Sequence, residues 1–466
     1  MSAVAGQSAR NFQASLALDN ARTKGLVLSH ALGFALFAEF AFNFIRVEVP
    51  FTPILSLPIR LIALWLILDR NWRLGPTRLC LWDWTFIGFM ILSTLGVLLS
   101  SLDPAIVVGF DAQRNMLGLI FNAYLYFLVV REACNRRGFR PDIMLNWFYV
   151  AMCWSAVLGL LQANHVASIR DWSLRLYSPM GRENFADKAY GTASHFNGMA
   201  FEMLVACGIA FNPVFRRRPK WWEWLMGLLF LAAFIATESR GGMITFIVAG
   251  YATFLFFFWN GRRGTSMIIF TMITLAILIW GFIVFALKIE RFTRVIEGEK
   301  VRTSAYLGTF RYRLDRGGEL IKLGMKQPIF GVGRTNVALG SSERLAFQSA
   351  SSVGGTLDMM YPRMFAEFGI VGMLFIFCVI GYLLSFIRRS MAARPFAYSA
   401  FICGVILFVH GFAEYLVFSR GMMVIGVVAA LATEPWLVSE RGRIVQRVRS
   451  FANGEPEKAE ALGHGA

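Results

Sequence analysis

Long apolar runs constrain this chain more than any other feature of its sequence. A helix that crosses a bilayer needs about 20 mainly apolar residues, and the 466 residues contain twelve runs that fit this requirement. Only 16% of the residues are charged, against about 25% in soluble domains, which excludes a soluble enzyme. We therefore predict an all-α polytopic membrane protein. The expected spans are residues 26–45, 51–68, 82–100, 115–130, 143–163, 193–212, 221–237, 242–259, 266–287, 368–387, 395–418 and 421–437.

The distribution of Lys and Arg predicts how these spans are oriented. Cytoplasmic loops of membrane proteins carry an excess of both residues. With the N-terminus in the cytoplasm, the segments on that side hold 24 of them, and four short outer loops hold one each. The expected organisation is a cytoplasmic tail (1–25), spans one to nine (26–287), a large periplasmic loop (288–367), spans ten to twelve (368–437) and a cytoplasmic tail (438–466).

Two longer outer segments break this charge pattern. Residues 164–192 carry four basic residues, and residues 288–367 carry 13 basic against 8 acidic residues. Long loops cross the bilayer largely regardless of charge, so the topology stands. The outer basic excess suggests that this face handles an anion. No soluble module with a basic face is visible, so we expect no nucleic-acid partner, and the spacing of the six cysteines predicts neither a disulfide framework nor a metal site.

The turn Thr237-Glu238-Ser239-Arg240-Gly241-Gly242 joins two expected spans at the outer surface. A guanidinium there can hold phosphate oxygens in a bidentate manner, and the two glycines allow close approach of a ligand to the backbone. The alternative is an ordinary tight turn with an arginine that reaches toward the headgroups.

The large outer loop holds the next candidates. An amphipathic helix is expected after Thr309, with Leu314, Ile321 and Met325 on one face. Further along the loop, Asp358 and Glu367 precede the tenth span, and each is a candidate general base if it lies within reach of an acceptor hydroxyl. Surface carboxylates with no catalytic role are the common alternative.

Further polar residues lie at the start of span six and inside the spans. His195 could polarise a sugar or phosphate oxygen, although a polar residue that merely marks the entry of a span is the commoner outcome. Charged residues in spans usually face a cavity or one another. Arg60 could pair with Glu202 or with Glu39, and the sequence does not choose. His410 could pair with Glu414, four residues on.

In this order and topology, the segments over about residues 180–390 resemble the bacterial O-antigen ligase and O-antigen polymerase superfamily. Four pieces carry the resemblance: Gly191 to Asn197 opening a span, Ser239-Arg240-Gly241 at an outer turn, Arg313 followed by Pro328-x-x-Gly331-x-Gly333, and Glu367-Phe368-Gly369-Ile370-Val371-Gly372 entering a span. Each piece alone is weakly specific, but their order around one large outer loop is more specific.

The resemblance implies a membrane glycosyltransferase of the bacterial inner membrane that needs neither a metal nor another cofactor. Such enzymes take a glycan from undecaprenyl diphosphate and transfer it to a hydroxyl at the periplasmic face. A ligase uses the lipid A core as acceptor, and a polymerase uses another lipid-linked unit. The outer arginines of the family correspond here to Arg240 and Arg313, with Arg311 as the substitute, and these would hold the diphosphate. Asp358 and Glu367 would be catalytic, and His195 and Asn197 would contact substrate.

One position departs from the family pattern. Many ligases have a His-Asn pair nine residues before the glutamate of the last motif, where this chain has Asp358 and Met359. A carboxylate can act as a base but cannot donate like an imidazole, which favours a polymerase-like or other surface-polysaccharide role over a strict ligase. A lipid-linked oligosaccharide flippase is the alternative from another class. Transporters tend to have two related halves, and no half-repeat is visible in this sequence.

Overall fold

In the computed structural model, the described residues are mostly helical and include no strand. The description covers residues 2–42, 57–68, 79–101, 110–136, 138–164, 189–193, 196–212, 221–259, 317–332, 359–388, 394–412 and 420–433, with a few positions between 166 and 172.

Helices occupy eleven of the twelve expected spans, and the remaining span, 266–287, lies outside the described residues. The long helices follow the apolar runs because lipid cannot satisfy backbone hydrogen bonds, and a helix satisfies them internally. The helices are α1 (Ser2–Phe42), α3 (Leu57–Leu68), α4 (Leu81–Ser101), α5 (Phe110–Cys134), α6 (Pro141–Ala163), α8 (Phe196–Ala210), α10 (Trp221–Ala236), α11 (Arg240–Trp259), α16 (Met360–Leu384), α17 (Ala397–His410) and α18 (Gly421–Thr433), with a short 3-10 helix at Ser385–Arg388.

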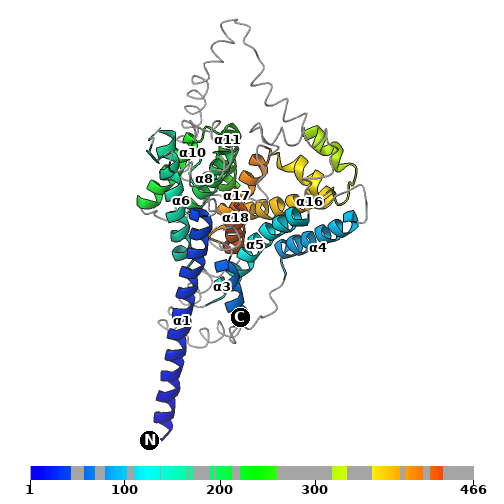
Figure 1. The fold of residues 1–466 in the computed structure, drawn as a ribbon. Coiled ribbons are helices and arrows are strands. Elements are labelled where there is room, and N and C mark those ends of the chain that lie inside the picture. Colours follow the sequence, from blue (N-terminus) through cyan, green and yellow to red (C-terminus); the bar gives the residue numbers. More distant parts are fainter. Residues whose placement is uncertain are drawn as a thin grey trace.

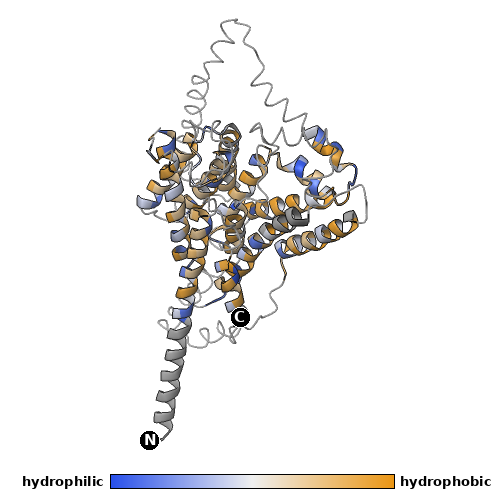
Figure 2. Cartoon of the chain, in the orientation of Figure 1, coloured by the Kyte–Doolittle hydropathy of each residue, from blue (hydrophilic) through white to orange (hydrophobic). Residues whose placement is uncertain are grey.

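Four helical segments among the described residues are long and apolar enough to cross a bilayer. They are Arg22–Phe42, Leu81–Leu99, Pro141–Ala163 and Met360–Arg388. Apolar residues are widespread along the helices (Figure 2), and many large apolar side chains are exposed, among them Trp84, Ile91 and Trp221. A soluble protein rarely exposes so much apolar surface. The chain is therefore a multi-pass membrane protein.

Helices α17 and α18 lie in the middle of the bundle (Figure 1). On one side are α6, α8, α10 and α11, and on the other are α4, α5 and α16. Small residues allow these helices to approach closely. A Cβ atom added at Gly426 of α18 would lie 2.6 Å from the backbone oxygen of Ala123 in α5, and one added at Gly404 of α17 would lie 2.7 Å from Leu383 Cβ in α16.

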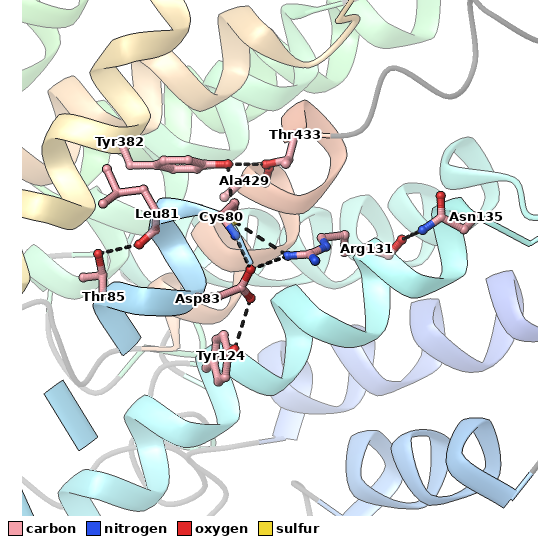
Figure 3. Close-up of polar contacts among 10 residues, drawn as sticks. All are labelled: Cys80, Leu81, Asp83, Thr85, Tyr124, Arg131, Asn135, Tyr382, Ala429 and Thr433. Carbon is pink, nitrogen blue, oxygen red and sulfur yellow. Dashed lines mark hydrogen bonds and ion pairs between the residues drawn. The ribbon is translucent and has the colours of Figure 1, made fainter. Parts of the chain in front are cut away.

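A polar cluster joins α4 and α5 at Asp83, and beside it Tyr382 of α16 contacts Thr433 of α18 and Cys80 (Figure 3). Asp83 Oδ2 accepts hydrogen bonds from Arg131 Nη1 at 2.5 Å and from the Cys80 backbone N at 2.8 Å. The hydroxyl of Tyr124 donates to Asp83 Oδ1 at 3.1 Å. The carboxylate thus caps α4 and neutralises a buried guanidinium, because a charge left unpaired there would be costly. All six cysteines are free thiols.

The large loop differs in detail from its predicted pattern. A helix is present at residues 317–324, but Ile321 and Met325 on its predicted apolar face are exposed, whereas Leu320 is buried. A Cβ atom added at Gly324 would meet the Phe365 ring at 2.7 Å, so this glycine lets the helix lie directly against α16. The packing face is therefore rotated from the predicted one.

Candidate functional site

Helix ends that the topology assigns to the outer surface lie close together at one end of the bundle. The Ala189 backbone N donates to Ala236 O at the end of α10, and the Met360 N that starts α16 donates to Gly411 O after α17. The cluster around Asp83 joins ends that the same topology assigns to the cytoplasm. In each case the ends that lie together are ends that the prediction places on one side of the membrane.

A tight turn at residues 189–193 is held against α6. Gln162 Oε1 accepts hydrogen bonds from the backbone N of Tyr190 and Gly191 at 3.1 and 2.8 Å. Gly191 has a φ of +54°, and a Cβ atom there would lie 2.5 Å from Ser155 Oγ. Only glycine fits this conformation at this distance. The glycine that opens the first family-like segment therefore fixes the chain that leads into α8.

A buried ion pair lies directly beneath this turn. Arg420 Nε and Nη2 approach Glu202 Oε1 and Oε2 at 2.5 and 2.7 Å. The same guanidinium donates to Thr192 Oγ1 at 2.9 Å and to Phe40 O at 2.8 Å. Both charged side chains are at most 4% exposed. The pair joins α1, α8 and the start of α18 to the turn, and its additional hydrogen bonds offset the cost of removing two charges from water.

This pairing excludes one of the two partners that the sequence allows for Arg60, and the other, Glu39, stays a prediction. Glu202 pairs with Arg420 and not with Arg60, whose Nη2 instead donates to Asn122 Oδ1 at 3.4 Å. Among the described residues, α17 ends at His410, and the expected pairing of His410 with Glu414 stays a prediction. Glu414 lies outside those residues.

The outer turn at residues 237–242 starts α11. Ser239 Oγ accepts a hydrogen bond from the backbone N of Gly242 at 3.1 Å, which is the N-cap arrangement. The same hydroxyl donates to Asn197 Oδ1 at 2.8 Å, in the first turn of α8. Ser239 and Asn197 are both buried. The starts of α8 and α11 are thereby held side by side, with Arg240 as the first residue of α11.

Two helix starts in contact create a favourable place for an anion. The N-terminus of a helix carries a partial positive charge and backbone N–H groups that lack partners within the helix. Arg240 adds a full charge to this end of α11, where the structure describes its backbone and not its side chain. Of the two glycines that follow, Gly241 is half-buried, and Gly242 is buried with its N–H bonded to Ser239 Oγ. Negatively charged oxygens are the chemical group that this arrangement suits.

Helix α16 begins with a second charged pair. Arg363 Nε lies 2.9 Å from Glu367 Oε1, one helical turn along, and Glu367 is buried. The carboxylate that the sequence suggests as a general base thus already accepts a hydrogen bond. The pair lies in the first part of α16, before the kink at Gly369, whose φ and ψ are 59° and −148°.

Two of the family-like segments fit together as one joint. The Ile370 N donates to Pro328 O at 2.8 Å, and the Val332 N donates to Ala366 O at 2.8 Å. Gly331 and Gly369 face each other in this joint, each with positive φ. A Cβ atom at Gly331 would lie 2.4 Å from Phe368 N, and one at Gly369 would lie 2.5 Å from Ile329 O. The joint fixes the loop helix at 317–324 against the start of α16.

The structure brings together only part of the predicted site. Asn197 and the Arg240 backbone lie at one junction, and Glu367 lies at the start of α16. His195, Asp358, Arg311 and Arg313 lie outside the described residues. Sequence reasoning missed Arg420, Gln162 and Arg363 as partners of the predicted segments. The one available signal was Arg420 itself, a lone charge in a very short outer loop.

The fold defines a helical membrane protein, and the junction of α8 and α11 gives one end of it a polar arrangement that suits an anion. A comparison with protein families makes the identification more particular. The family model described as O-antigen ligase (Wzy_C) matches residues 225–377, from α10 into α16. The match confirms the resemblance to the O-antigen ligase and polymerase superfamily, and it indicates a membrane enzyme of surface-polysaccharide assembly. None of the curated proteins matches the chain.

Proposed function

We propose that this protein is a metal-independent glycosyltransferase of the bacterial inner membrane. It moves a glycan from an undecaprenyl-diphosphate carrier to a hydroxyl acceptor at the periplasmic face, in polymerisation or ligation of a surface polysaccharide. Both termini would lie in the cytoplasm, with twelve spans and one large periplasmic loop. The match to the O-antigen ligase family over residues 225–377 supports this proposal.

The observation that carries the proposal is the position of Arg240 at the junction of two helix starts. The hydrogen bond between Ser239 and Asn197 fixes this junction. A diphosphate leaving group gains negative charge as its bond to the sugar breaks, and positive groups fixed in advance stabilise that charge. We assign this role to Arg240 with Arg313, and with Arg311 if Arg313 does not reach. His195 and Asn197 would contact the sugar or phosphate.

The acceptor hydroxyl must lose a proton as it attacks the sugar. We propose that Asp358 or Glu367 accepts this proton as general base. Asp358 precedes α16 in the sequence, and Glu367 lies in its first part. Arg363 holds the Glu367 carboxylate in place at 2.9 Å, so Glu367 has one oriented oxygen. Asp358 replaces the His-Asn pair of many ligases, and for this reason we favour a polymerase-like acceptor, a second lipid-linked unit.

Purified protein in detergent tests the reaction class. With a lipid-linked oligosaccharide as donor and acceptor, we expect longer carrier-linked chains without a sealed compartment. A flippase needs two compartments and would give no new glycosidic bond in detergent. In a deletion strain, single repeats attached to the lipid A core indicate a lost polymerase, and unattached long chains indicate a lost ligase.

A further inference from the structure

The last turn of α17 contacts the starts of both helices that carry the proposed chemistry. His410 Nδ1 lies 3.2 Å from Thr245 Oγ1, in the second turn of α11. The next residue, Gly411, accepts a hydrogen bond from the Met360 N at 2.8 Å, at the start of α16. A short segment of α17 thus links the helix that begins with Arg240 to the helix that follows Asp358.

Hydrogen-bond accounting fixes the direction of the contact between His410 and Thr245. The Thr245 hydroxyl has a single proton, and it lies 2.7 Å from Gly241 O, which can only accept. Thr245 Oγ1 must therefore accept from His410, so the proton of the ring is on Nδ1. In the neutral ring Nε2 then carries the lone pair, and in the imidazolium Nδ1 remains a donor.

The contact is sheltered from water. Thr245 and His410 are each 0% exposed, and the Phe201 ring of α8 lies 5.8 Å from the imidazole. A Cβ atom at Gly411 would lie 2.3 Å from Met360 Cε, so the glycine permits the close approach of α17 to α16. Hydrogen bonds in such surroundings are stronger than in water, and losing one partner leaves a buried polar group.

We propose that His410 is a positioning residue for glycan transfer. Its Nδ1–H orients the Thr245 hydroxyl, which in turn holds the carbonyl of Gly241 in the first turn of α11. This chain of hydrogen bonds sets the direction in which α11 presents Arg240 to the diphosphate. His410 exchanges no proton with the substrate. The proposal rests on the proposed function, because that function gives Arg240 its role.

Amide side chains test which ring nitrogen matters. In His410→Asn the amide N–H occupies the place of Nδ1, whereas in His410→Gln it occupies the place of Nε2. We expect His410→Asn to keep the KM for the lipid-linked donor within about three-fold of wild type. His410→Gln and His410→Leu should raise that KM by about three- to ten-fold, the range of one lost hydrogen bond. The pH profile of His410→Asn should match wild type.

Thr245 provides the matched control. Thr245→Ser keeps the acceptor and should behave as wild type, whereas Thr245→Val should match His410→Leu. The double variant Thr245→Val, His410→Leu should be no worse than either single variant, because both remove one contact. Loss of transfer in His410→Asn, or loss of a limb of its pH profile, would overturn the proposal, since it would show acid–base chemistry.

A stability measurement separates this proposal from the proposed function. The apparent unfolding temperature in detergent should be higher for His410→Asn than for His410→Gln, and this order does not depend on any substrate. If the wild type makes no glycosidic bond, the proposed function fails, whereas an inverted order of unfolding temperatures overturns the assigned hydrogen-bond direction. If unfolding temperatures differ but the KM values do not, the contact is only structural and the positioning role is wrong.

Discussion

Arg420 has the largest expected effect on stability of the single residues described. Its guanidinium neutralises Glu202 and also bonds Thr192 and Phe40 O. Arg420→Met should lower the free energy of unfolding by about 3–5 kcal/mol, because it leaves Glu202 as an uncompensated buried charge. Chemical denaturation in detergent measures the loss, and a change below about 1 kcal/mol would contradict the account.

Arg140 offers a matched control for Arg420. It also pairs with a carboxylate, Asp142, at 2.7 Å, but both side chains are 60% exposed. The nearby carboxylate raises the pKa of Arg140, so the guanidinium stays charged. Exposed pairs contribute about 0–1 kcal/mol, and Arg140→Met should therefore change unfolding much less than Arg420→Met.

Two glycines of the joint between the loop and α16 should tolerate no side chain. Gly331→Ala and Gly369→Ala each place a Cβ atom within 2.5 Å of backbone atoms at positive φ. Backbone strain of this kind costs about 1–3 kcal/mol, and the clash adds to it. Both variants should unfold at lower temperature than wild type. Gly381→Ala, also in α16, meets nothing within 4 Å and should be neutral or stabilising.

The site is only partly predictable from the sequence, because its contacts join residues that are far apart in the chain. The segment around Gly331 and the segment around Gly369 were each identified, but nothing local indicates that they form one joint. In the same way, Glu202 carries no sign that its partner is Arg420 rather than Arg60. Burial fixes the choice, because only Arg420 also has Thr192 and Phe40 O within reach. Sequence patterns identify which residues are costly in lipid, and packing decides with which partner each one pairs.

At the scale of an element, the start of α11 depends on the Ser239 hydroxyl. Ser239→Ala removes both the cap of Gly242 N and the donor to Asn197. An N-cap contributes about 0.5–2 kcal/mol, so stability should fall by that amount, and the donor KM should rise as Arg240 loses its fixed place. Ser385→Ala removes an exposed hydroxyl that bonds only its own turn and should change neither quantity. Equal behaviour of the two variants would contradict the role given to the cap.

Helix positions were more predictable than helix ends. The run 221–237 corresponds to α10 (Trp221–Ala236), because an apolar segment bounded by polar residues must form a helix to satisfy its backbone hydrogen bonds in lipid. Helix α16 starts at Met360, well before the predicted 368, because the kink at Gly369 lies inside it. Hydropathy identifies the apolar part of α16 after the kink, but it does not identify the more polar turns before the kink as part of the same helix. Helix α1 likewise starts at Ser2, within the predicted polar tail.

At the scale of the whole molecule, the topology predicts opposite accessibility for two ends of the bundle. Glu238, exposed in the turn before α11, should face the periplasm, and Cys80, half-buried just before α4, should face the cytoplasm. In single-cysteine proteins in intact cells, Glu238→Cys should react with a membrane-impermeant maleimide, and Cys80 should not. Labelling of both from outside would contradict the orientation.

The same thiol gives a dependence on pH. Burial raises the pKa of Cys80 above its ordinary value, so little thiolate is present at neutral pH. The thiolate is the reactive form. In permeabilised cells, labelling of Cys80 should therefore be slow at pH 7 and accelerate as the pH rises. A rate that is already maximal at pH 7 would contradict the burial of this end.

The central claim is that Arg240, at the junction of α8 and α11, holds the diphosphate of a lipid-linked glycan. The most direct measurement is the rate of glycan transfer by purified Arg240→Ala in detergent, compared with Arg140→Ala, an exposed arginine at the other end of the bundle. We predict that Arg240→Ala loses about 1.5–3 kcal/mol of binding, as for a charge-assisted hydrogen bond, with a fall of ten-fold or more in kcat/KM, and that Arg140→Ala matches wild type. Transfer by Arg240→Ala at the wild-type rate, in protein that is folded and expressed normally, would contradict the claim.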